Sequence, residues 1–208
     1  MNLKFLASFL LLCAVVLYST KRSDRAEEQA ERNFWNKERR ANSVRKKSLD
    51  ALNYITIPSA ILNMRPVNMT EEIRDYLKDL KDLSAMPIVN LTGISNTDLK
   101  LAYGTANITA LTEYDSHYTN MVTVLQKLAQ CLVEQNEKEC AVEVLEFAVS
   151  TGTDVSKTYY LLASLYLEKG QQTRIRELIT KASSLNTLMK TSIVQKLEDM
   201  LTSSLEQP

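Results

Sequence analysis

The stretch that decides the fold reads YYLLASLY over residues 159–166, and it repeats, 34 positions later, the pattern LQKLAQCL of residues 125–132. Bulky and small side chains return at the same places, and the agreement continues into the next segment. The first set is Leu125, Leu128, Ala129, Leu132, Ala141, Leu145, Ala148 and Thr153, and the second is Tyr159, Leu162, Ala163, Tyr166, Ile175, Ile179, Ala182 and Thr187. A fixed period of this length is typical of stacked helical hairpins, so we expect an all-α fold.

The composition agrees with a helical protein that carries no strong charge. Only four glycines and four prolines occur in 208 residues, and both residue types interrupt helices. Lys plus Arg and Asp plus Glu number 25 each. A balanced charge argues against a general nucleic-acid binder, which needs a net basic surface. The three cysteines lack metal-ligand spacing. Cys131 and Cys140 are expected to be small buried thiols, with a disulfide between them as the alternative.

Residues 118–202 are predicted to form helical repeats followed by a cap. Turn residues separate the expected helices, and Asp154 or Ser156 suits the N-cap of the third. The turn residues are Asn136, Gly152, Gly170 and Asn186. The expected helices cover 119–135, 138–150, 156–169 and 173–184, with the capping helix at 188–202. Earlier helices should cover the N-terminal side of the stack, and Ile193, Leu197 and Met200 its other side.

Tyr159, Leu162, Ala163 and Tyr166 resemble the first-helix pattern of the tetratricopeptide repeat family, although Ile175 departs from the small residue expected on the second helix. The resemblance implies a concave groove that receives an extended or helical peptide. Carried over by position, its lining is Thr123, Gln126, Gln130, Val133, Lys157, Tyr160, Ser164 and Leu167. In the alternative interpretation, Tyr160 and Leu167 pack against residues 50–118, which then fill the groove.

Residues 1–20 are predicted to be a transmembrane anchor. The run from Phe5 to Tyr18 is uncharged and apolar apart from Ser8, and it reaches 18 residues when it is extended to Leu3 and Thr20, with Lys4 able to reach the interface. That length is near the lower limit for crossing about 30 Å of hydrocarbon. The alternative is a cleaved signal peptide of an exported, envelope-facing binding protein, although no A-x-A cleavage site follows the run.

The basic residues after the anchor predict its orientation. Lys21, Arg22 and Arg25 follow at once, and cationic flanks stay on the cytoplasmic side, so the rest of the chain should face the cytoplasm. Residues 21–48 form a basic polar stalk. This stalk either lies against anionic headgroups, with Phe34 and Trp35 at the interface, or stands as a solvated helix.

Residues 49–117 are predicted to be an irregular, partly helical leader. Thr70 suits the N-cap of an amphipathic helix over 71–84. Asn96 or Thr97 should cap a short turn that Gly104 closes, and a helix is expected over 108–118. Four strings of the leader are similar to strings in small membrane-anchored proteins of Gram-positive bacteria, a resemblance that implies no activity. They are YITIP at 54–58, NLTG at 90–93, SNTDLK at 95–100 and YG at 103–104.

One cluster has residues of catalytic type. Asp98, Glu113, Asp115 and His117 lie close in sequence, and a histidine beside carboxylates suits a metal site or an acid–base pair. Glu113, Asp115 and His117 are two residues apart, however, and therefore point in different directions on a helix. The favoured function is a membrane-anchored protein–protein docking or assembly module with no catalytic activity, no metal and no cofactor. A metal-dependent hydrolase using Asp98, Asp115 and His117 is the less favoured alternative.

Overall fold

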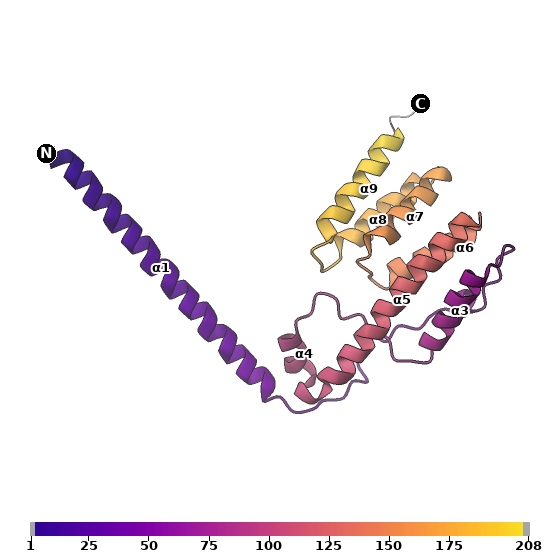
Figure 1. Ribbon diagram of the computed structural model, residues 1–208, viewed down its shortest axis with the longest axis horizontal. Coiled ribbons are helices and arrows are strands. Elements are labelled where there is room, and N and C mark those ends of the chain that lie inside the picture. Colours follow the sequence, from indigo (N-terminus) through magenta and orange to yellow (C-terminus); the bar gives the residue numbers. More distant parts are fainter. Residues whose placement is uncertain (1–2, 206–208) are drawn as a thin grey trace. The chain divides into compact units, whose positions relative to one another are not determined.

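The computed structural model describes residues 3–205 of the chain (Figure 1), without the side chains of residues 3–8, Ala14 and Leu205. Across the described residues no strand forms, and an isolated antiparallel bridge joins Tyr54 to Val89. The prediction of an all-α fold is therefore confirmed. The helices are α1 Leu3–Asn42, α2 Ser59–Leu62, α3 Glu71–Leu83, α4 Asn96–Tyr103, η1 Thr105–Asn107, α5 Ile108–Glu134, α6 Lys138–Ser150, α7 Ser156–Glu168, α8 Gln172–Ser183 and α9 Lys190–Leu205.

The chain divides into two compact units, and each is described by itself. The first contains Met1–Ser48 and Ser95–Ile108, and the second contains Leu49–Ile94 and Thr109–Pro208. Helix α1 belongs to the first unit and α3 and α6–α9 to the second, while α5 lies in the second from Thr109 onward.

In the first unit, the end of α1 packs against α4. Ala41 is fully buried there, and the Lys47 amide donates to the Tyr103 carbonyl oxygen at 3.0 Å. The buried Asn107 side chain donates to the carbonyl oxygens of Lys47 and Tyr103 at 2.7 and 2.8 Å. These bonds fasten the chain after α1 to the loop after α4.

Helix α1 runs without a break through the predicted anchor and most of the predicted stalk, because no glycine or proline interrupts residues 3–42. The predicted anchor, residues 1–20, lies partly outside the described residues. Among the residues that the structure describes, no helix combines the length and the apolar character needed to cross a membrane.

The core of the second unit forms around the residues that recur 34 positions apart. All sixteen positions of the two sets are buried except Ile179 and Thr187, which are half-buried. These buried faces hold α5–α8 together. Helix α9 packs on α7 and α8 and buries Ile193 and Leu197 completely. Met200 is half-buried against the same core.

Helix α3 packs against α5. Its buried residues Ile73, Leu77 and Leu80 join the core, and the Cys131 thiol of α5 donates to the Glu72 carboxylate at 3.5 Å. Thr70 caps α3, since its hydroxyl accepts the Ile73 amide at 3.2 Å. The predicted helix and its cap are therefore confirmed.

Three local predictions are wrong. Helix α5 is one helix from Ile108 to Glu134, not two helices that meet near Tyr118. Ser95, not Asn96 or Thr97, caps α4, through a hydrogen bond from the Asp98 amide. Neither Asp154 nor Ser156 caps α7, which has Val155 at its N-cap position.

Candidate functional site

The residues of the predicted peptide groove lie on α5 and α7 of the second unit. Thr123, Gln130 and Lys157 are exposed, and the others are half-buried. The half-buried residues are Gln126, Val133, Tyr160, Ser164 and Leu167. Val133, Tyr160 and Leu167 pack against the hydrophobic core, so only part of each side chain remains available to a partner.

The polar groups on this face make contacts within the fold. The Thr158 hydroxyl donates to the Gln126 side-chain oxygen at 2.8 Å, which links α7 to α5. The Tyr160 hydroxyl lies 3.5 Å from the Ser192 carbonyl oxygen of α9. The Ser164 hydroxyl donates to its own helix at Leu161. Gln126 therefore helps to join α5 and α7, whereas Thr123, Gln130 and Lys157 are presented to solvent.

Three residues of the candidate catalytic cluster, Asp98, Asp115 and His117, have separate structural contacts, and Glu113 is exposed. Asp98 pairs with Lys37 at 2.7 Å in the first unit. In the second unit, the Asp115 carboxylate accepts the Leu91 amide at 3.0 Å, and the His117 Nδ1 lies 2.8 Å from the Pro87 carbonyl oxygen. Over the described residues, no three His, Cys, Asp or Glu side chains are grouped so that they could hold a metal ion.

The pKa of the Asp98 carboxyl lies below its ordinary value, chiefly because Lys37 hydrogen-bonds to it and secondarily because Ser95 does. A carboxyl held in its charged form by a lysine is suited to an ion pair. It is poorly suited to donating a proton as a general acid near neutral pH.

The segment Asn90–Gly93 connects distant parts of the second unit. The Asn90 amide donates to the Tyr118 hydroxyl at 3.0 Å and to the carbonyl oxygens of Thr151 and Gly152 at 2.9 and 3.2 Å. The Asn186 side-chain amide donates to the Gly93 carbonyl oxygen at 3.2 Å. This string therefore fastens the leader to α5, to the turn before α7 and to the turn before α9.

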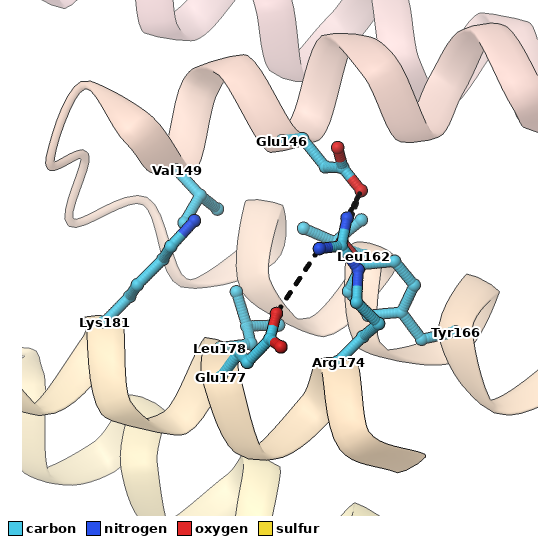
Figure 2. A pocket seen from close by; sticks show the side chains of 8 residues that line it. All are labelled: Glu146, Val149, Leu162, Tyr166, Arg174, Glu177, Leu178 and Lys181. Atoms are coloured by element: carbon cyan, nitrogen blue, oxygen red, sulfur yellow. Dashed lines mark hydrogen bonds and ion pairs between the residues drawn. The ribbon is translucent and has the colours of Figure 1, made fainter. Parts of the chain in front are cut away.

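A cleft of about 170 Å³ lies among α6, α7 and α8 (Figure 2). Its charged centre is the Glu146 carboxylate, which accepts hydrogen bonds from the Tyr166 hydroxyl at 2.6 Å and from Arg174 at 2.5 Å. The Arg174 guanidinium also lies 5.4 Å from the centre of the Tyr166 ring and 3.3 Å from the Glu177 carboxylate. Burial, and then the hydrogen bond to Glu146, raise the pKa of Tyr166 well above its ordinary value.

This network was not predicted from the sequence. Glu146 on α6 and Arg174 on α8 are separated by 28 residues. No local sequence pattern indicates that two charged residues so far apart will meet. Two further ion pairs start from α6. Lys138 pairs with Glu168 at the end of α7, and Glu139 pairs with Lys169, the residue that follows α7. These pairs are largely exposed, so each contributes little to stability.

Helix α1 displays apolar side chains with no partner over more than two turns. Their exposed fractions are Phe9 57%, Leu10 60%, Leu11 70%, Leu12 60%, Val15 58%, Val16 52%, Leu17 64% and Tyr18 70%. Consecutive residues of a helix point in all directions, so the whole circumference is apolar. The predicted membrane-surface residues Lys21, Arg22 and Arg25 follow on the next turns, and all three are exposed.

No protein-family model matches the chain, and comparisons with curated proteins and with solved structures give no significant match.

Proposed function

We propose that the protein is a membrane-tethered docking module that holds a protein or peptide partner and performs no chemistry. The apolar turns of α1 supply the tether, and the helices of the second unit supply the surface. The single observation that carries this proposal is the exposure of the large apolar side chains between Phe9 and Tyr18, which lie on all sides of this part of α1.

An apolar helix surface of this kind is unfavourable in water. Burial of apolar surface stabilises a protein by about 25 cal/mol per Å². Burying eight large side chains that are now exposed would therefore release several kcal/mol of free energy. Monomeric soluble proteins rarely expose a continuous patch of this size. In the sequence the uncharged run begins at Phe5, and extension past Lys4 to Leu3 and forward to Thr20 gives a length close to that of a membrane span.

The second unit supports the docking part of the proposal. Its buried residues recur every 34 positions along α5–α8, as in the tetratricopeptide-like stack that the sequence resembles. Helical stacks of this type present an extended face to partners. Asp98, Asp115 and His117 are engaged in structural contacts, which favours docking over hydrolysis.

The tether is tested by alkaline extraction of membranes that contain the full chain. The wild type should resist extraction, because its apolar helix is buried in lipid. Leu11→Arg with Leu12→Arg should release most of the protein, since a charged residue costs about 3 kcal/mol at the centre of a membrane helix. Gln29→Arg with Asn33→Arg adds the same charge to an exposed part of α1 and should release none. Extraction of the wild type would contradict the tether, and a mature chain starting near Thr20 would favour the exported alternative.

The docking face is tested by a photo-crosslinking amino acid placed at Lys157 or at Arg176. Lys157 is exposed on the predicted groove face of α7, whereas Arg176 is exposed on α8. A partner held in the groove should crosslink at position 157 and much less at position 176. Equal recovery at both positions would count against the groove.

A further inference from the structure

A second groove lies between α3 and α5, beside the predicted peptide face. It has a volume of about 420 Å³, within the range of about 300–1,000 Å³ found for ligand pockets. Its apolar lining is Leu83, Met86 and Val124, and Met86 is 45% exposed. We call it the α3–α5 groove. Its remaining lining residues are Asp79, Asp82, Asn120, Thr123 and Lys127.

The α3 wall of this groove is acidic. Asp79 and Asp82 line the groove, and Glu72 and Asp75, which lie outside the lining, continue the same face of α3 at intervals of three and four residues. All four are exposed. Within the described residues, neither Asp79 nor Asp82 takes part in an ion pair. The negative charge beside the apolar lining is therefore available to a partner.

The α5 wall makes the groove continuous with the predicted peptide face. Thr123 lines the α3–α5 groove and also belongs to the face that continues through Gln126 and Gln130. A segment that begins in the groove can therefore extend along α5. Lys127 is the single cation of the lining, so the two aspartates leave the groove with a net negative charge.

We propose that the α3–α5 groove receives an amphipathic helical segment of a partner protein, with an apolar ridge flanked by Lys or Arg. The apolar ridge would cover Leu83, Met86 and Val124, and the cationic flank would face Asp79 and Asp82. Helix-in-groove recognition commonly combines these two features. The inference rests on the proposed docking function and names the location and chemistry of the bound segment.

The test uses the full chain in nanodiscs of zwitterionic lipid, with empty discs as the blank. The probe is a fluorescent helix-forming peptide of leucine and lysine, compared with the same peptide carrying glutamate in place of lysine. The lysine peptide should bind and the glutamate peptide should not. Asp79→Lys with Asp82→Lys should weaken binding about tenfold, because two charge pairs are lost and repulsion replaces them. Added salt should weaken binding to the wild type.

The matched control reverses two acids on another helix of the same unit. Glu198 and Asp199 of α9 are both exposed, so Glu198→Lys with Asp199→Lys changes the net charge equally. This variant should bind the lysine peptide as the wild type does. Met86→Asp should weaken binding while it keeps the acidic wall. Circular dichroism verifies the helix content of each variant.

Three outcomes would overturn the assignment: no binding of the lysine peptide, equal binding of the glutamate peptide, or equal weakening by both double variants. Crosslinking of a partner at Lys157 separates this inference from the proposed function. If that crosslink forms while the lysine peptide fails to bind, the α3–α5 groove is wrongly assigned and the docking function stands.

Discussion

The side-chain amide of Asn90 donates a hydrogen bond to the backbone carbonyl oxygen of Thr151 at 2.9 Å, across 61 residues of sequence. The same amide also reaches the hydroxyl of the buried Tyr118. A half-buried side chain thus satisfies polar groups on α5 and on the turn before α7. The string NLTG at residues 90–93 carries part of the sequence resemblance. This arrangement shows that its first residue has a structural role.

Asn90→Ala should lower the free energy of unfolding by about 1–3 kcal/mol, because it leaves the Thr151 and Gly152 carbonyl oxygens without this donor. Chemical denaturation followed by circular dichroism measures the change. Asn53→Ala is the control, since Asn53 is an exposed asparagine of the same leader. It should change stability by less than about 0.5 kcal/mol. Equal effects of the two substitutions would show that Asn90 does not fasten the leader.

Much of the helical framework was predictable, because apolar periodicity and turn residues are local signals. The predicted helix over 138–150 matches α6, and 156–169 and 173–184 differ from α7 and α8 by a single residue at their ends. The continuity of α5 was missed although a signal was present: no glycine or proline lies between Gly104 and Gly152. Ser95 was missed as a cap although Asp98 follows three residues later, as in a capping box.

The contacts between segments were not predictable. Asn90 with Thr151, and Glu146 with Arg174, join polar residues that lie 61 and 28 positions apart. Periodicity shows which face of a helix is buried, but it does not show which polar residue a neighbouring helix will present. The α3–α5 groove was missed for the same reason, because its lining comes from α3, from Met86 just after it and from α5, and α4 lies between these helices in the chain.

Gly93→Ala should be more destabilising than Gly170→Ala. Both glycines have positive φ, +79° at Gly93 and +65° at Gly170. Each alanine substitution should therefore cost about 1–2 kcal/mol of stability, because alanine disfavours the left-handed conformation. A methyl group at Gly93 would also overlap the Asn186 carbonyl oxygen, whereas at Gly170 nothing lies within 4 Å. Thermal unfolding of the two variants measures the difference. A Gly170→Ala variant as unstable as Gly93→Ala would contradict the close approach of the leader to the turn before α9.

The contact between α1 and α4 should weaken in acid. Lys100 and Thr97 hydrogen-bond to the Glu38 carboxylate and hold its pKa below the ordinary value of 4.5. A group whose pKa is lowered by folding contributes stability above its unfolded pKa, and the contribution is lost as the pH falls through the folded value. Stability of the first unit should therefore fall as the pH drops below about 4.5.

Trp35 provides the measurement, because it is the single tryptophan of the chain and precedes Glu38 by about one turn. Its fluorescence during thermal unfolding should report a melting temperature that falls with acid. Glu38→Gln should reduce this dependence, because glutamine does not titrate. Glu28→Gln is the control, since Glu28 pairs with Arg32 where both side chains are about two-thirds exposed. An unchanged pH dependence in Glu38→Gln would rule out this carboxylate as its source.

Tyr166→Phe should lower the free energy of unfolding by about 1 kcal/mol, because it removes the 2.6 Å hydrogen bond to Glu146 from a buried hydroxyl. The phenylalanine ring can keep the contact with the Arg174 guanidinium. Tyr160→Phe is the matched control. Its hydroxyl lies 3.5 Å from its acceptor, a weak hydrogen bond, so the loss should be below about 0.5 kcal/mol.

The Arg174–Glu146 pair should contribute less than the tyrosine. The two side chains are 46% and 37% exposed, so solvent screens their attraction, and Arg174→Gln should cost less than about 1 kcal/mol. This smaller loss should shrink further in high salt, whereas the Tyr166→Phe loss should persist because it reflects a neutral donor removed from the core. Urea denaturation at two salt concentrations distinguishes the two contributions. If both losses vanish in salt, the network acts through surface charge alone, and the buried tyrosine hydroxyl does not hold α6 and α7 together.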